Sequence, residues 1–217
     1  MTVREDILRR IRQNLGVADQ QGRREAAEAW LNTRQRGPQP EIRGSLVERF
    51  QEKAEAQAST VHRVARGAEI PAAVAAYLQT HRLGTSLVAS ADSAGYDWPG
   101  HGLNVDIRSA TGDDAVGLTG CYCAIAETGT LLLHSGTETP STISLLPETH
   151  LVVLPAARIV ATMEDAFHRL RHDLGYLPRA LNFISGPSRT GDIEQTLVLG
   201  AHGPCRVHII ILYEEFA

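Results

Sequence analysis

The spacing of hydrophobic residues changes near residue 60. Residues 1–59 are rich in Arg, Glu, Gln and Ala, and their few apolar positions follow a helical period. Beyond that point, short apolar runs alternate with helical stretches. The pattern therefore predicts an N-terminal helical extension over residues 1–59 and an α/β domain over residues 60–217.

The extension contains two amphipathic stretches separated by a break. The first, REDILRRIRQNLG (4–16), places four apolar side chains on one helical stripe, namely Ile7, Leu8, Ile11 and Leu15. RQRGPQP (34–40) interrupts the pattern with two prolines and a glycine. A second helix is expected within residues 44–59, with Ser45 as its N-cap. These residues carry no catalytic side chains at a useful spacing, so an arm that docks a partner is the expected role.

The rest of the chain predicts a doubly wound, largely parallel sheet. Strands are expected at 60–65, 85–90, 105–110, 151–156 and 207–213, and helices at 69–82 and 158–175. Runs such as VHIIILY are almost continuously apolar, which suits strands covered on both faces. In such folds ligands bind at the carboxyl ends of the strands.

A turn-rich segment, residues 181–204, is one candidate site. It predicts a strand over 181–184, a tight turn at Ser185, Gly186, Pro187 and Ser188, and a helix through Ile193 and Leu197 to Gly200. Free N–H groups at a helix start favour an anion, and Ser188, Arg189 and Thr190 would add two hydroxyls and a guanidinium. Simple capping explains the same residues, and Asp192 and Glu194 fit that alternative. From the residues alone the two alternatives stay equally open.

Glu127 lies in an apolar setting, in AIAETGTLLL (124–133). Small neighbours allow close backbone approach, and a buried carboxylate there would have a raised pKa unless hydrogen bonds stabilised it. The alternative is a hairpin turn in which Glu127 faces solvent and Gly129 adopts a positive φ. Sequence alone favours the hairpin.

Histidine and cysteine positions give weaker signals. His168 and His172 have a metal-chelating spacing, but without an HExxH pattern a solvated helix face is expected. His150 and His202 are each expected to be structural when taken alone. Cys121, Cys123 and Cys205 are the only cysteines, too few for the four ligands of an iron–sulfur cluster, and buried inert thiols are expected.

Composition excludes several classes of protein. A net charge of −4 and 5 % aromatic residues argue against a nucleic-acid-binding surface. No apolar run approaches the length of a membrane span, and the N-terminus lacks a signal-peptide pattern. Walker and GxGxxG loops are absent, so no nucleotide cofactor is indicated. We expect a cytoplasmic protein without a cofactor of its own.

Three motifs in order resemble the LUD-domain family: AIAETGTLLL (124–133), SLLPETHLVVL (144–154) and SGPSRTGDIEQTLVLGAHGP (185–204). REDILRRIRQNLG is also typical of such proteins. The resemblance implies a fold like that of CoA-transferases, ribose-5-phosphate isomerase and formyltetrahydrofolate cyclo-ligase. It also implies a part in oxidising L-lactate to pyruvate, in a system whose partner subunits carry the iron–sulfur clusters.

The resemblance marks specific positions as site candidates. The motif residues are Glu127, Thr128, Gly129, Thr130, Pro147, His150, Ser185, Gly186, Pro187, Ser188, Arg189, Thr190, Asp192, Glu194, His202, Gly203 and Pro204. Gly191 stands where alanine is common in the family. An arginine expected near Ser141 or Thr142 is missing. If that arginine normally holds a substrate carboxylate, either Arg189 or Arg158 compensates for it or substrate binding is weaker here.

Three functions follow as expectations. The leading one is the cluster-free subunit of a lactate-oxidising system, whose 127–130 and 185–190 turns form one crevice for a small 2-hydroxy or 2-oxo acid or for a partner's cofactor. There Thr128, Gly129, Thr130 and the 185–190 turn would bind the acid, and Glu127 or His202 would move a proton. The second is a non-catalytic assembly or regulatory subunit. The third is an autonomous CoA-transferase-like enzyme with Glu127 as nucleophile.

Overall fold

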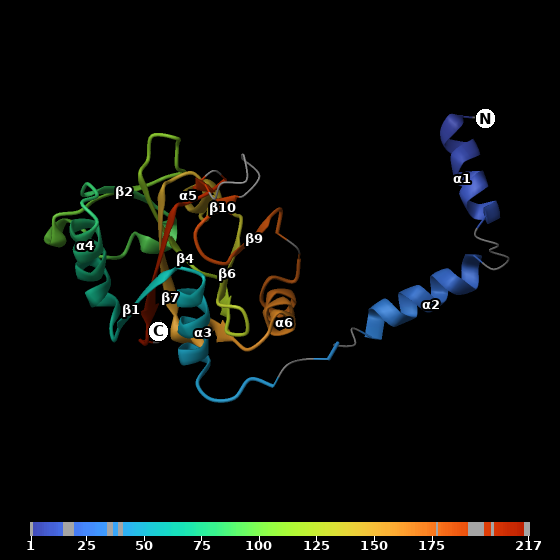
Figure 1. Cartoon of the computed structure of the whole chain (residues 1–217), viewed down its shortest axis with the longest axis horizontal. Helices are drawn as coiled ribbons and strands as arrows, with labels where there is room; N and C mark the ends of the chain where they lie inside the picture. The colour runs from blue at the N-terminus through green and yellow to red at the C-terminus, as the bar shows by residue number, and fades with distance from the viewer. Residues whose placement is uncertain are drawn as a thin grey trace. The chain divides into compact units, whose positions relative to one another are not determined.

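A six-stranded parallel sheet forms the centre of the α/β part of the chain (Figure 1). The computed structural model describes residues 2–14, 20–33, 37–38, 41–176, 178–190, 198–200 and 202–214. The strands in sheet order are β1 (Thr60–Val64), β12 (Arg206–Leu212), β7 (Thr149–Pro155), β4 (Val116–Gly120), β2 (Ser86–Ala89) and β3 (Asn104–Ile107). Every neighbouring pair is parallel, which confirms the predicted fold class.

The adjacent strands β7 and β12 bury both faces. In β7, Leu151 and Val153 pack on the side of helix α4 (Ile70–Thr80), and Val152 and Leu154 pack on the other side. Strand β12 alternates in the same way. Helix α3 (Leu46–Ala56) covers the second face with Phe50 and Ala54. The runs of these strands are thus continuously apolar because both faces of the sheet are covered, as expected.

A second, mixed sheet packs beside the first, and the sequence predicted only its strand over 181–184 and its hairpin at Glu127. Its order is β8 (Ile159–Val160), β5 (Cys123–Ile125), β6 (Thr130–His134) and β9 (Leu181–Ile184), with β5–β6 and β6–β9 antiparallel. One face joins the core under α3, and the other packs against Ala166 and Leu170 of α6 (Met163–Leu174). Figure 1 shows α4 and α6 at opposite sides of the α/β part.

The remaining short elements connect these layers. They are η1 (Gly67–Glu69), η2 (Ala91–Ser93), η3 (Pro99–His101), α5 (Thr142–Leu145), η4 (Ala156–Arg158), β10 (Arg189–Thr190) and β11 (Val198–Leu199). Strand β4, which begins at Val116, was not among the predicted strands. Helix α6 begins at Met163, later than predicted, because Ile159 and Val160 form β8 and Thr162 caps the helix in a capping box.

The helix predicted through Ile193 and Leu197 is wrong at both of its ends. Arg189 pairs with Leu199 in an antiparallel ladder, and residues 191–197 lie outside the described part. The strand pairing of Val198 and Leu199 outweighs the helical spacing of the apolar positions at this end. The expected anion site at a helix start is therefore not formed after this turn.

The N-terminal region forms its own unit. The chain divides into Met1–Pro40 and Glu41–Ala217, so α3 lies in the α/β unit, whereas the sequence placed residues 1–59 together. The reason is the burial of Phe50 and Ala54 of α3 in the domain core. Helices α1 (Val3–Asn14) and α2 (Gln20–Thr33) belong to the first unit, and α1 confirms the first predicted helix. Within the described residues, no helix is both long and apolar enough to cross a membrane.

Gly129 connects the β5–β6 turn to α3. Its φ is +68°, and a Cβ there would overlap the backbone of Lys53 and Ala54. Gly175, which ends α6, has nearly the same φ of +67° but open space around it. Gly129 is therefore required by both its backbone conformation and close packing, and Gly175 by its backbone conformation alone.

We expect Gly129→Ala to lower the free energy of unfolding by about 2–4 kcal/mol, because backbone strain and overpacking add. Gly175→Ala, the matched control, should cost only about 1 kcal/mol. Urea unfolding of both variants measures the difference. Equal losses would contradict the close packing of the turn against α3.

Candidate functional site

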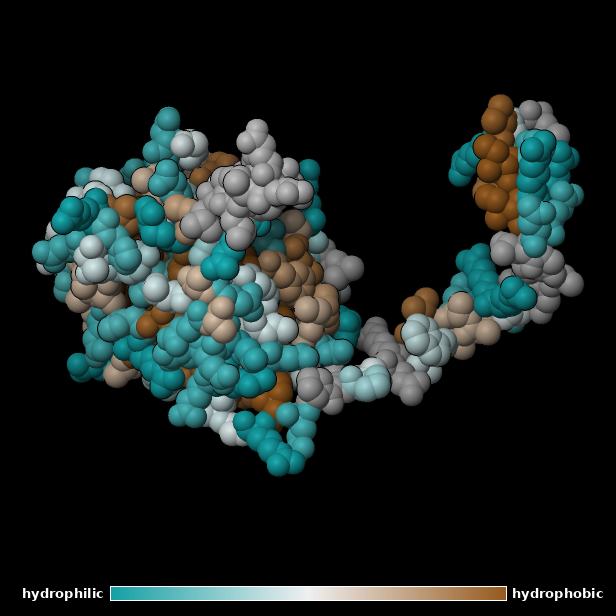
Figure 2. Space-filling view, viewed as in Figure 1, coloured by the Kyte–Doolittle hydropathy of each residue, from teal (hydrophilic) through white to brown (hydrophobic). Residues whose placement is uncertain are grey.

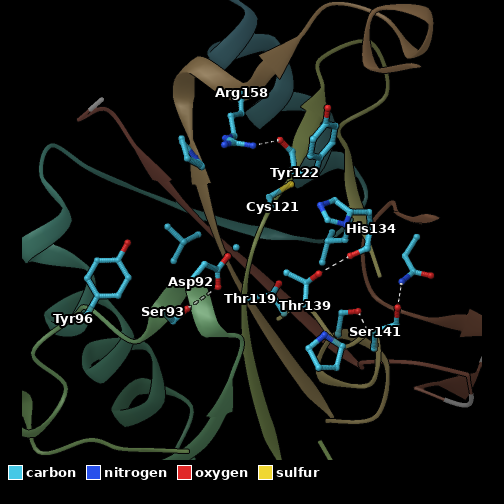
Figure 3. Close-up of a pocket in the computed structure, with 17 residues that line it drawn as sticks. Asp92, Ser93, Tyr96, Thr119, Cys121, Tyr122, His134, Thr139, Ser141 and Arg158 are labelled. Atoms are coloured by element: carbon cyan, nitrogen blue, oxygen red, sulfur yellow. Dashed lines mark hydrogen bonds between the residues drawn. The ribbon is translucent and has the colours of Figure 1, made fainter. Parts of the chain in front are cut away.

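A cavity of about 350 Å³ opens at the carboxyl edge of the central sheet, where the fold predicts ligand binding (Figure 3). The ends of β2, β4 and β7 form one wall, and β6, β9 and the loop before α5 form the other. Its polar lining residues are Asp92, Ser93, Tyr96, Thr119, Cys121, Tyr122, His134, Thr139, Ser141, Ser144, Arg158 and Asn182. The cavity thus lies between the two sheets.

Arg158 is the cation of this cavity. It follows β7 in the 3₁₀ turn η4, and its Nη1 donates to the carbonyl oxygen of Tyr122 at 3.0 Å (Figure 3). Among the described residues, no carboxylate forms an ion pair with this guanidinium. Its other N–H groups are therefore available to an anionic ligand.

Asp92 supplies a carboxylate to the same cavity from η2, just beyond β2. Ser90 Oγ donates to Asp92 Oδ1 at 2.5 Å, and Ser93 Oγ donates to the same oxygen at 3.4 Å. The Trp98 indole N–H donates to the Ser93 carbonyl oxygen at 2.9 Å and anchors this turn. The carboxylate is thus held in one orientation.

A buried histidine stands behind the cavity wall. His150 Nε2 lies 2.8 Å from Thr119 Oγ1, and Thr119 lines the cavity. Burial lowers the pKa of His150 to about 3, so the ring is neutral at physiological pH. The His150 Nδ1 atom has no partner among the described residues. Since a buried acceptor without a partner is tolerated better than a donor, the favoured tautomer carries its proton on Nε2.

Tyr122 and His134 form the side of the cavity next to Arg158. Their rings meet edge to face with centroids 5.4 Å apart, and Tyr122 OH donates to Asp173 Oδ2 at 3.0 Å. Burial, with a smaller effect of Asp173, raises the pKa of Tyr122 to about 12. Burial likewise raises the pKa of Cys121, whose thiol donates to the Cys123 carbonyl oxygen at 3.0 Å. Both groups stay protonated, as the sequence predicted for the thiols.

The two predicted turns do meet, but through direct hydrogen bonds. Thr130 Oγ1 lies 2.7 Å from Ser185 Oγ and also accepts from Thr128 Oγ1 at 2.7 Å. The Gln57 side chain, just after α3, donates to the Thr128 carbonyl oxygen, and a Cβ at Gly186 would overlap the Gln57 carbonyl oxygen. These motif residues therefore join the β5–β6 turn, the end of β9 and α3.

The other predicted site residues lie apart from the cavity. Glu127 is in the β5–β6 turn, as the hairpin alternative predicted, and its N–H donates to the Ala161 carbonyl oxygen at 3.0 Å. Arg189 is exposed, and His202, also exposed, donates its backbone N–H to Ser188 Oγ at 3.3 Å. None of these three lines the cavity. Their catalytic and binding roles stay predictions.

Some candidates fall outside the described positions. Asp192 and Glu194 lie in the segment 191–197, and only the backbone of Thr190 is described. Among the described residues, no group of three or more His, Cys, Asp or Glu side chains is placed to hold a metal ion.

Sequence reasoning missed Asp92 and His134. It named Arg158 only as a replacement for the arginine that is missing near Ser141 or Thr142. The available signal for Asp92 was SADS (90–93), which directly follows a predicted strand at the carboxyl edge. His134 gave no signal, because its position depends on the second sheet.

Buried neutral histidines should make the fold sensitive to acid. The pKa of His150 is lowered to about 3 and that of His208, packed against Tyr77, to about 4, in both cases mainly by burial. The unfolded chain, with ordinary histidine pKa values near 6.5, binds more protons below that pH, so stability falls as pH falls.

We expect the free energy of unfolding to fall between pH 6.5 and about 4 by up to about 1.4 kcal/mol per pH unit for each of the two histidines. Urea unfolding across this range measures the slope. His208→Gln should reduce the slope, whereas His101→Gln at an exposed position should not. A free energy of unfolding that stays constant over this pH range in the wild type would contradict the assignment of His150 and His208 as buried neutral side chains.

Comparisons with known proteins agree with this architecture. A 24 % identical structure of a DUF162 family protein from Deinococcus radiodurans matches with a TM-score of 0.57, over 80 % of this chain and 99 % of that one. This likeness supports the fold alone.

Sequence relatives carry a functional name. The chain is 38 % identical over 100 residues to lactate utilization protein C of Anoxybacillus flavithermus, covering 46 % of this chain and 44 % of that protein. It is 33 % identical over 132 residues to lactate utilization protein C of Bacillus subtilis, covering 55 % of each. The chain thus spans about half the length of the curated relatives it matches. The LUD domain family profile matches residues 47–212, which include α3, both sheets and the cavity, and the chain therefore belongs to the LUD domain family.

Proposed function

We propose that this chain takes part in lactate utilization and binds a small 2-hydroxy or 2-oxo acid in the cavity at the carboxyl edge of its sheet. The similarity to proteins named lactate utilization protein C supports the process. The Arg158 guanidinium supports the site, because an arginine without an ion-pair partner in a partly buried cavity is suited to a carboxylate.

We further propose that the chain is the cluster-free member of a multi-subunit system oxidising L-lactate to pyruvate. Its three cysteines are fewer than the usual four ligands of an iron–sulfur cluster. Of these, Cys121 and Cys123 are buried, and burial raises both of their pKa values. In this proposal the clusters belong to partner subunits.

Exchange of the two candidate arginines tests the site. Calorimetric titration of L-lactate and pyruvate into the full chain should show binding that Arg158→Gln weakens about 10- to 100-fold, the usual effect of losing a charged hydrogen-bond donor. Arg189→Gln, which removes the same charge from an exposed position outside the cavity, should bind like the wild type.

The reverse result, with loss only in Arg189→Gln, would place the acid at the 185–190 turn instead. A wild type that binds neither acid would remove the proposal of a substrate site. Circular dichroism of each variant confirms that the fold is intact.

The exposed face of α1 favours a second candidate function, that of an assembly subunit. Val3, Ile7 and Ile11 are 79 %, 52 % and 49 % exposed, and no residue of α1 is buried. Figure 2 shows these apolar side chains as a continuous stripe along α1, beside polar residues. An apolar stripe of this kind on one face of a helix suits a groove on a partner protein.

We expect the double variant Ile7→Gln and Ile11→Gln to lose co-purification with iron–sulfur proteins from the native host, because the apolar stripe would no longer bury itself. Iron content and mass spectrometry of the eluate measure this. The control Gln13→Ala with Asn14→Ala keeps the stripe and should retain the partners. Retention of the partner proteins by both variants would contradict this second candidate function.

A further inference from the structure

The Asp92 carboxylate in the cavity does not help to bind a ligand whose only polar group is a carboxylate. A negative charge disfavours an anionic ligand, yet Asp92 lines the same cavity as Arg158. Figure 3 shows the two side chains entering from different elements, Arg158 near Tyr122 and Asp92 near Ser93 and Thr119. The cavity therefore offers both a cation and a carboxylate to its ligand.

The hydrogen bonds of Asp92 divide its two oxygens. Oδ1 accepts from Ser90 and Ser93, at 2.5 and 3.4 Å. Oδ2 accepts no hydrogen bond from the described residues and lies against Gly120, where a Cβ would overlap it. The absence of a side chain at residue 120 thus lets the carboxylate approach the end of β4, with one oxygen left for a ligand.

The surroundings of Asp92 contain no compensating cation. Among the described residues, no Lys, Arg or His forms an ion pair with it, and the groups against it are the Ser90 and Ser93 hydroxyls and Gly120. Burial, with further contributions from Asp92 and Glu214, raises the pKa of Tyr96, which lines the same cavity. The Oδ2 atom is accordingly an acceptor for which the described part of the chain supplies no donor.

We propose that Asp92 is a specificity-determining residue that accepts a hydrogen bond from the C2 hydroxyl of a 2-hydroxy acid whose carboxylate is held by Arg158. This inference rests on the proposed function. It makes the 2-hydroxy acid, rather than the 2-oxo acid, the preferred ligand. Asp92 is then the second group of the cavity, beside Arg158, that recognises this ligand.

The physical reason is the difference between a hydroxyl and a carbonyl. A hydroxyl donates a hydrogen bond, whereas the carbonyl of a 2-oxo acid only accepts. An ionised carboxylate is also only an acceptor, so it binds the hydroxyl and repels the carbonyl oxygen. A site built to pair with a substrate hydroxyl rejects the analogue that lacks it.

Three acids that differ only at C2 test this proposal on the full-length chain. L-Lactate has a hydroxyl at C2, pyruvate a carbonyl and propionate neither. We expect calorimetry of the wild type to show L-lactate binding about 10- to 100-fold more tightly than pyruvate, the scale of one charged hydrogen bond. In Asp92→Asn, an amide that both donates and accepts, this ratio should fall to within a few fold.

Propionate and a charge control separate recognition from simple electrostatics. Removing a negative charge from the cavity strengthens binding of all three acids alike, so the lactate-to-pyruvate ratio is the diagnostic quantity. Asp113→Asn removes the same charge from an exposed position outside the cavity and should leave the ratio at its wild-type value.

The outcomes distinguish the two proposals. A wild type that binds pyruvate as tightly as lactate overturns the role of Asp92 without any variant, as does an unchanged ratio in Asp92→Asn. Either result, together with a loss of binding in Arg158→Gln, leaves the proposed acid site standing. If the wild type binds none of the three acids, both proposals fall.

Discussion

Burial of both faces of β7 and β12 is the constraint on which the rest of the structure depends. Two adjacent strands whose alternate side chains all need cover require a layer on each side, and α4 and α3 supply these layers. The mixed sheet then extends the layer under α3. Because this second sheet stands beside the carboxyl edge of the first, the space between them becomes the cavity.

The chemistry of the cavity follows from this arrangement. Loops that leave parallel strands have no regular partners, so they carry the charged groups, here Asp92 after β2 and Arg158 after β7. Hydroxyls and the Tyr122 carbonyl oxygen fix both side chains without neutralising them. Behind them, the neutral His150 supports Thr119 with no charge of its own. The two opposite charges therefore stay available to a ligand.

Sequence patterns predicted what depends on local or repetitive signals. The parallel strands other than β4, helices α4 and α6 and the Ser45 cap of α3 were all readable from apolar spacing and capping residues. The mixed sheet as a whole was not, because its strands are short and β6 pairs with β9 about 50 residues further along the chain, although the strand over 181–184 and the hairpin at Glu127 were expected. The helix predicted after Ser188 failed at its ends because Arg189 and Thr190 pair with Leu199 and Val198 as strands, a long-range pairing that an apolar spacing of four residues does not reveal.

The site residues also divide into those that the sequence could indicate and those that depend on long-range structure. Motif resemblance led to Thr130 and Ser185, which do lie together, but their hydrogen bond joins two turns. Their neighbours Gly129 and Gly186 are needed for close approach to the chain around α3. A recurrent motif can thus record a packing requirement as well as a chemical one. Asp92 and Arg158 stand in short turns whose importance appears only when the strand order is known.

The contacts of Gln57 have a practical consequence for any shortened form of this protein. This residue follows α3 and touches both the β5–β6 turn and the turn after β9. A chain begun at residue 60 would lack the surface against which two glycine turns are shaped, and would expose the core face that Phe50 covers. The smallest self-sufficient unit therefore starts ahead of Ser45, and mapping by truncation has to respect that limit.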